Sequence, residues 1–152
     1  MREFVLLDSG PLGLACGRPG VPAHDSCRHW FRALIVRGVI VVVPEIADYE
    51  VRRELMRVGA SHSLRRLDEL IMTGGLFFAP VTTAEWRQAA FFWADARQKG
   101  MPTAHPHALD ADVILAGCAV TTGHPGDQVL VATNNVGHLA RYCDARLWTT
   151  IT

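Results

Sequence analysis

The amino-acid sequence predicts an α/β protein of three layers, in which helices cover both faces of a central parallel sheet of four to five strands. Short apolar runs rich in β-branched residues alternate along the chain with longer segments that have helical spacing. Two of the runs, at 39–43 and 129–132, are continuously apolar, which is typical of strands buried on both faces. The 152 residues fit one domain spanning 1–152, without repeats or linkers.

The first half of the chain predicts two strands and two helices. Residues 3–7 form a β-type run that ends at Asp8, and we expect the following SGPLG segment to be a turn because it is rich in Gly and Pro. A helix over 27–38 begins after Asp25 or Ser26 and ends at Gly38, with Trp30, Leu34 and Ile35 at helical spacing. The strand 39–43 and a helix over 44–58 follow, and that helix directs inward Ile46, Tyr49, Val51 and Leu55.

The second half continues the alternation. Ser61 is expected to cap a helix that ends at a glycine pair, and residues 76–81 form a minor strand. A helix over 82–100 lacks a full capping box when Thr83 is read with Trp86, and it presents an apolar stripe of Trp86, Ala89, Ala90 and Trp93. The remaining elements are a helix over 110–123, a strand at 128–133, a turn with a short helix over 135–143, and a last strand at 145–150.

Composition narrows the classes of partner and compartment. Fifteen basic and fifteen acidic residues give zero net charge, so the overall field does not favour a polyanion. The four cysteines have no CxxC spacing, and we expect reduced, mostly buried thiols. No apolar run approaches the roughly 20 residues of a membrane span, and the N-terminus lacks a secretory pattern. We therefore expect a cytoplasmic protein without membrane contact.

Four polar side chains from distant parts of the chain are expected to meet at one edge of the sheet. Asp8 ends the first strand, Glu50 lies early in the next helix, Asp112 opens the helix over 110–123, and Asn135 follows the strand that ends at 133. In an open parallel sheet the functional crevice lies beyond the carboxyl ends of the strands, where such residues fall.

Each of these residues also has a structural explanation. Asp112 fits a helix cap, and Asp8 and Asn135 fit turn residues. Glu50 has helical spacing to Arg53 and Arg57 and could simply pair with one of them. Two carboxylates about 4 Å apart repel by roughly 4 kcal/mol at an effective dielectric constant near 20, so a gathering of acids calls for a cation.

Oxygen ligands without a close His/Cys set favour Mg²⁺ or Mn²⁺ over zinc. His105 and His107 precede the Asp110–Asp112 pair, but with Cys118 they lie on different elements, so a substrate contact or a solvated loop explains them better than a soft-metal site. Nucleotide-binding signatures are missing, since GPLGLACG is not GxGxxG and no GxxxxGK[ST] occurs. A receiver-type phosphoacceptor would need a lysine after a late strand, and Lys99 precedes the acidic helix instead.

The order of five segments resembles the PIN (PilT N-terminus) domain nucleases, in particular the VapC-type toxin ribonucleases. The segments are LLDSGPL, PEIADYEVRREL, AAFFWADARQKGMP, LDADVILAGCAV and VLVATNNVGHLARY, and they cover nearly the whole chain. The resemblance implies a PIN-like fold and assigns the catalytic and metal-binding roles to Asp8, Glu50 and Asp112, with Asn135 in the fourth position. It places Ser9, Thr133 and Asn134 beside them.

Two positions depart from the family pattern. The fourth acidic position is Asn135, which leaves three carboxylates and Asp110 as a ligand, a supporting group or a plain helix cap. The Asp-Phe pair that usually follows the Thr-x-Asn element is His138-Leu139 here.

The resemblance implies a divalent-metal-dependent endoribonuclease with Mg²⁺ or Mn²⁺ as cofactor, which acts as the toxin of a toxin–antitoxin pair. Arginines near the acids, among them Arg53, could contact the RNA backbone. A cognate antitoxin and a homodimer, in which the aromatic segment 91–93 could take part, are the expected protein partners. The alternative is a catalytically inactive PIN-fold module that binds RNA or protein.

Overall fold

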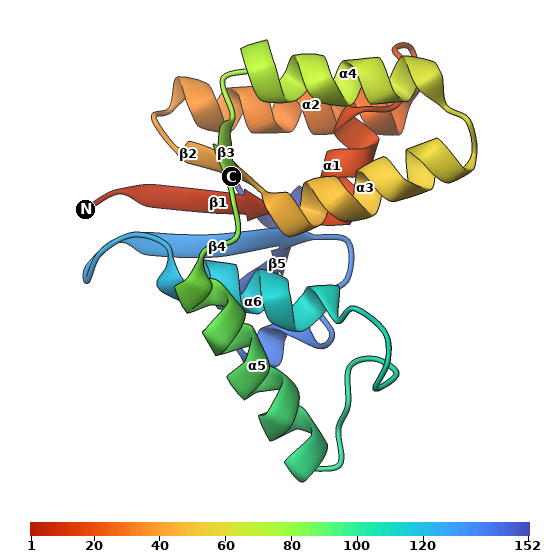
Figure 1. Cartoon of the computed structure of the whole chain (residues 1–152). Coiled ribbons are helices and arrows are strands. Elements are labelled where there is room, and N and C mark those ends of the chain that lie inside the picture. The colour runs from red at the N-terminus through yellow and green to blue at the C-terminus, as the bar shows by residue number, and fades with distance from the viewer.

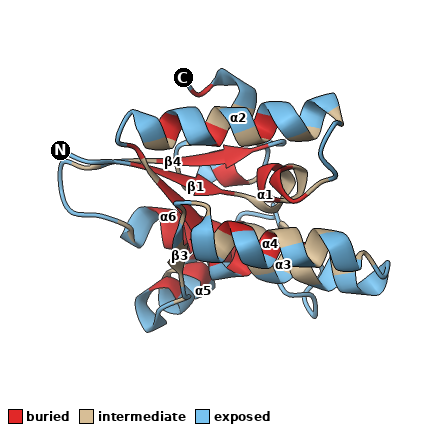
Figure 2. Cartoon of the chain, turned by 90° about the horizontal axis from the view of Figure 1, so that it is seen from above, coloured by how far each residue is buried: buried red, intermediate tan, exposed pale blue.

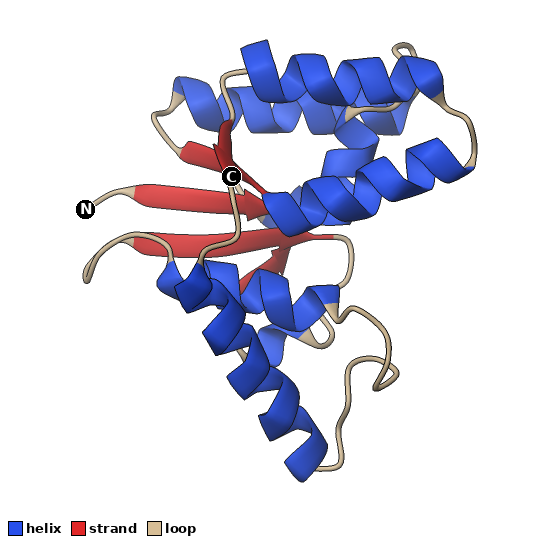
Figure 3. Ribbon diagram, viewed as in Figure 1, coloured by secondary structure: helices blue, strands red, loops and turns tan.

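Five parallel strands form the centre of the protein, in the order β3-β2-β1-β4-β5 (Figures 1 and 3). A computed structural model describes all 152 residues. The central β1 pairs with both β2 and β4, so that Val5 lies between Val41 and Leu130. The predicted parallel sheet is confirmed. The strands are β1 (Glu3–Leu7), β2 (Ile40–Pro44), β3 (Phe77–Ala79), β4 (Gln128–Thr133) and β5 (Ala145–Leu147).

Helices cover the two faces of the sheet, as the three-layer prediction requires (Figure 3). One face packs mainly against α1 (Ser9–Ala15), α2 (Pro22–Val36), α3 (Glu45–Arg57) and α4 (Ser61–Thr73), and the other against α5 (Thr83–Gln98), α6 (Ala111–Thr121) and the 3-10 turn η1 (Leu139–Arg141). Each face of the sheet has its own hydrophobic core, and alternate residues of β1 point into the two cores. Val5 and Leu7 pack in the core on the first face, and Phe4 and Leu6 pack in the core on the second face. Figure 2 shows the buried sheet between helices whose outer faces are exposed.

The segment after Asp8 is a helix, and the predicted turn is wrong. The side chain of Asp8 caps α1 by accepting a hydrogen bond from the Ser9 N–H at 2.7 Å. Pro11 lies in the first helical turn, where its missing N–H costs no intrahelical bond. Gly and Pro therefore do not prevent a helix here, because the cap from Asp8 and the burial of Leu12 favour it.

Two other helix starts differ from prediction. Helix α2 begins at Pro22, which supplies the fixed backbone angle suited to a first helical position, rather than after Asp25. Asp25 instead accepts a hydrogen bond from the Gly20 N–H at 3.0 Å and pairs with Arg28. Ser61 is the first residue of α4 and provides no side-chain cap.

Helix α5 buries a different face from the predicted one. Its inward residues are Glu85, Ala89, Phe92 and Ala96, whereas Trp86 is 48% exposed and Trp93 36% exposed. The start is a complete capping box between Thr82 and Glu85, one residue earlier than the pair considered from sequence. The Arg97 guanidinium lies 3.7 Å from the centre of the Trp93 ring, which gives this exposed ring a partner.

Smaller differences concern the remaining expectations. Ile46 and Val51 are buried in α3 as predicted, but Tyr49 is exposed beneath Arg53. The last strand ends at Leu147, and a 3-10 turn, η2 (Trp148–Thr150), follows it. All four cysteines are free and three are buried. No helix combines the length and the apolar character needed to cross a membrane.

Candidate acidic site at the carboxyl edge of the sheet

Asp8 is fixed between two elements at the carboxyl end of β1. The parallel register places Leu7 beside Ala132, so the residues that follow, Asp8 and Thr133, emerge together. One carboxylate oxygen of Asp8, Oδ1, accepts the Ser9 N–H at 2.7 Å, and the other, Oδ2, accepts the Thr133 hydroxyl at 2.7 Å. Both oxygens of this half-buried carboxylate are therefore oriented by the protein.

The turn after β4 is built on Thr133. The hydroxyl of this buried residue accepts a hydrogen bond from the Asn135 N–H at 3.0 Å while it donates to Asp8. The side chain of Asn135 is exposed, and its amide oxygen accepts a hydrogen bond from the Gly137 N–H at 3.1 Å within the same turn. Thr133 thus links the predicted Asn135 position to Asp8.

Asn134 rests directly on the first turn of α1. A Cβ atom added to Gly10 would lie 2.5 Å from Nδ2 of Asn134, so only a glycine permits this approach without displacing the side chain. The contact brings the turn after β4 against the helix that begins at Asp8.

Glu50 and Asp112 complete the group of acids. Burial raises the pKa of Glu50, and the charge of Asp8 raises it further, while Arg53 lowers it and Asp112 adds a smaller upward contribution. Burial also raises the pKa of Asp112, followed by the charges of Asp8 and Asp110. The charge of Asp8, which follows β1, thus acts on Glu50 of α3 and on Asp112 of α6.

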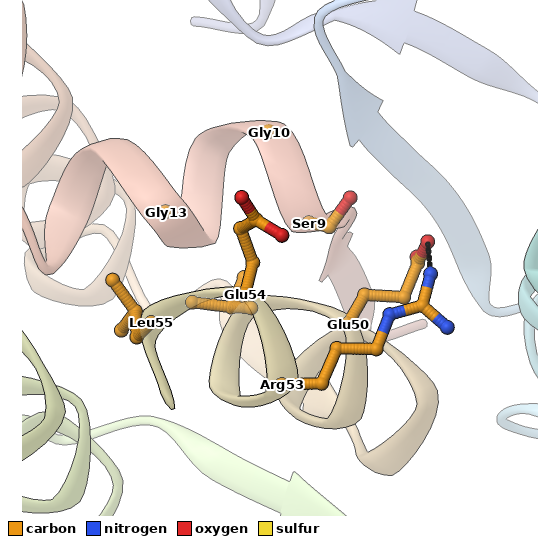
Figure 4. Close-up of a pocket in the computed structure, with 8 residues that line it drawn as sticks. Ser9, Gly10, Gly13, Glu50, Arg53, Glu54 and Leu55 are labelled. Carbon is orange, nitrogen blue, oxygen red and sulfur yellow. Dashed lines mark ion pairs between the residues drawn. The ribbon is translucent and has the colours of Figure 1, made fainter. Parts of the chain in front are cut away.

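The counter-charge available within the protein is small. A guanidinium nitrogen of Arg53 lies 3.9 Å from the Glu50 carboxylate, on a half-exposed side chain (Figure 4). Asp112 makes no ion pair with an arginine or lysine. The three oxygen donors therefore have the chemistry of a hard divalent cation site.

The acids are nevertheless not packed into a closed cage. No three His, Cys, Asp or Glu side chains lie close enough together to form a ready-made metal-binding group. Asp110, which the sequence left between ligand and cap, is buried, accepts the Val113 N–H at 3.4 Å and is bonded to the Thr103 hydroxyl. These contacts make Asp110 the N-cap of α6.

A pocket of about 380 Å³ lies between α1 and α3, and of the three acids Glu50 lines it (Figure 4). The sequence did not single out Glu54, which lines it and pairs with Arg57. Arg53 is the arginine that lines the pocket, whereas Arg52 forms ion pairs with Asp48 and Asp68. Ser9, Gly10, Gly13, Glu50, Val51 and Leu55 complete the lining.

Other residues lie close to the acids without having been predicted as site residues. A positive charge on His138 would lower the pKa of Asp112. Burial and then the charge of Asp144 raise the pKa of the Cys143 thiol, and Asp8 and Asp112 add smaller contributions. The only sequence signal for this corner is the replacement of Asp-Phe by His138-Leu139. Cys118 contacts Glu85 instead of His105 or His107.

Comparison with known proteins identifies the fold. No protein-family model and no curated protein matches the chain by sequence. A chain of the VapBC2 complex from Rickettsia felis, bound to a promoter DNA fragment, superposes with a TM-score of 0.71 at 14% identity, covering 95% of this chain and 98% of that chain. A chain of FitAcB from Neisseria gonorrhoeae gives 0.65 at 17% identity, covering 97% and 99%.

A third similar structure is VapC20 from Mycobacterium tuberculosis, described as a toxin that cleaves the Sarcin-Ricin loop. Its TM-score is 0.59 at 12% identity, with coverage of 90% of this chain and 94% of that chain. The chain thus has the fold of these toxin structures, as its resemblance to VapC-type PIN domains led us to expect. At sequence identities this low, the likeness shows the fold alone, and the chemistry of the site has to be argued from the residues of this chain.

Proposed function

We propose that the protein is a divalent-metal-dependent endoribonuclease and the toxin of a toxin–antitoxin pair. One observation supports this most strongly. Asp8, Glu50 and Asp112 come from three distant parts of the chain, yet beside the effect of burial the charge of Asp8 raises the pKa of both Glu50 and Asp112, and Arg53 is the nearby cation. Asp8 also caps α1, but among the basic side chains only Arg53 pairs with one of these acids, and a divalent ion would remove the remaining repulsion.

In this proposal Asp8, Glu50 and Asp112 hold Mg²⁺ or Mn²⁺, and Asn135 completes the catalytic set. The bound metal supplies an activated water and offsets charge on the leaving oxygen of the phosphodiester. Ser9 and Thr133 keep both oxygens of Asp8 oriented through their hydrogen bonds. Asp110 is the N-cap of α6 and so stabilises the first turn of the helix that carries Asp112.

The pocket between α1 and α3 suits a strand of RNA leading to the acids. Arg53 lines this pocket and its side chain is half exposed. It can donate a hydrogen bond to a phosphate oxygen when a bound metal neutralises the charge of Glu50. Asn134 lies over Gly10 on the α1 side of the site, within reach of the substrate.

The proposed partners follow from the similar structures, which were solved as VapBC and FitAB complexes. We propose a cognate antitoxin, a homodimer and a cytoplasmic location for this chain as well. A specific observation favours an alternative, a catalytically inactive module that binds RNA or protein. The acids do not form a closed metal group, and Asn135 replaces a carboxylate.

One experiment separates the two functions. A mixed RNA pool is incubated with Mg²⁺ or Mn²⁺ and the wild type, Asp8→Ala or Asp112→Ala, and Mn²⁺ binding is measured by calorimetry. Asp68→Asn, which alters an exposed acid on α4, is the matched control. We expect cleavage and Mn²⁺ binding by the wild type and the control only. Cleavage at one rate by all four proteins, or by none with either metal, rejects the nuclease.

A further inference from the structure

His138 occupies a turn that is anchored beside the acids. It directly precedes η1, whose first residue, Leu139, is buried in the same core cluster as Val113 and Ile114 of α6. The turn begins at Asn135, which is connected through Thr133 to Asp8. The backbone on both sides of His138 is therefore held by the elements that carry Asp8 and Asp112.

Arg141 determines which ring nitrogen of His138 can donate. Its Nη2 lies 2.8 Å from Nδ1 of His138, and a guanidinium has only donors, so Nδ1 must accept. The proton of the neutral imidazole is then on Nε2. Arg141 is held from the other side by a hydrogen bond from Nη1 to the Met101 carbonyl at 2.7 Å. Nε2–H is thus presented as a donor by a fixed partner.

The pair lies on the turn that follows β4, and this turn is connected to Asp8 through Thr133. Leu139, the residue after His138, belongs to the same core cluster as Val113, the residue after Asp112. Neither His138 nor Arg141 forms an ion pair with a carboxylate. The partly exposed ring and the exposed guanidinium keep unused donors.

We propose that His138 and Arg141 bind a phosphate group of the substrate beside Asp112, through Nε2–H and the free guanidinium N–H groups. The inference rests on the proposed nuclease function and adds a substrate-binding residue to it. A phosphodiester approaching three carboxylates is repelled, and cationic or N–H donors at the rim offset this repulsion. A protonated Nε2 cannot ligate a metal, so the pair acts on the substrate instead of the ion.

The test uses three variants of the full chain. His138→Asp puts a carboxylate where the donor was, His138→Gln keeps an N–H donor without the ring, and Arg141→Gln removes the guanidinium. The control is His62→Asp on α4, where an exposed histidine contacts Arg65 with the same spacing of three residues at 3.0 Å. The readouts are binding of a labelled single-stranded RNA oligonucleotide in EDTA and, separately, Mn²⁺ binding without RNA.

We expect His138→Asp to weaken oligonucleotide binding by about tenfold, as loss of one charge-assisted hydrogen bond implies. The same variant should bind Mn²⁺ more tightly, because it adds an oxygen donor. Arg141→Gln should weaken RNA binding alone, and His138→Gln should stay within about threefold of wild type. A role in folding alone would not move the two affinities of His138→Asp in opposite directions.

The inference is overturned if the wild type binds no oligonucleotide, or if His138→Asp binds it as well as wild type or His62→Asp does. Wild-type protein that binds RNA through His138 but neither binds Mn²⁺ nor cleaves refutes the nuclease and leaves the phosphate contact standing. Circular dichroism and urea unfolding of each variant show whether it is folded.

Discussion

Replacing Asp8 by Ala tests whether this acid stabilises the fold as well as the site. The substitution removes the cap of α1, which contributes about 1 kcal/mol, and the hydrogen bond from Thr133, which contributes about 1.5 kcal/mol with a charged acceptor. Relief of repulsion on Glu50 and Asp112 offsets part of this loss. We expect a net loss of about 2 kcal/mol in the free energy of unfolding, or roughly 4–8 °C in melting temperature.

Asp8→Asn is the matched variant. Its amide oxygen can accept the Ser9 N–H, and its NH₂ group can donate to Thr133 once that hydroxyl turns to the Asn135 carbonyl, which lies 3.1 Å away. Urea unfolding at pH 7 without divalent metal should therefore place it within about 1 kcal/mol of wild type. The reasoning is refuted if Asp8→Ala is as stable as wild type, or if Asp8→Asn is destabilised equally. Both variants should lose Mn²⁺ binding.

Three further predictions concern charge and packing. Because the pKa of Asp112 is raised in the folded state, ionising this carboxyl costs folding free energy, and the cost grows as pH rises through the folded-state pKa. Asp112→Asn should therefore be more stable than wild type in urea at pH 7, and the difference should shrink on acidification. Gly117→Ala would place a Cβ 2.8 Å from a backbone carbonyl of α5 and should cost about 2 kcal/mol in urea unfolding, whereas Gly13→Ala, with ordinary contacts, should gain about 0.5 kcal/mol. The pKa of Asp127, lowered to about 2 by N–H and guanidinium donors, should rise only partly in Arg2→Ala by NMR titration, since backbone donors remain.

The parallel, buried character of the sheet was predictable from sequence because buried parallel strands carry continuous apolar runs, as in 39–43 and 129–132, whereas the strand order was not predicted. Local signals failed where tertiary contacts decide. SGPLG looks like a turn, yet the cap from Asp8 and the burial of Leu12 make it a helix. In α5, Trp86 and Trp93 dominate the apolar pattern, but the small Ala89 and Ala96 allow the closer helix packing and form the buried face.

The site shows the same division between pattern and contact. The convergence of Asp8, Glu50 and Asp112 could be predicted because the carboxyl ends of parallel strands share an edge. The capping role of Asp110 was one of the alternatives left open from sequence, and the hydrogen bond that Thr103 adds to it depends on the loop that precedes α6. The partner of His138 likewise depends on how η1 folds back beside α6.

The close approach of Asn134 to Gly10 limits how the mouth of the acidic site can change during evolution. One side of this approach is bare helix backbone, so any side chain introduced at residue 10 must displace the Asn134 side chain. Asn134 is exposed and its own backbone is unrestrained by positive φ, so substitutions there alter the width of the opening without moving the acids. If the proposed ribonuclease function holds, changes of substrate preference among related chains should accumulate at residue 134 while residue 10 stays glycine.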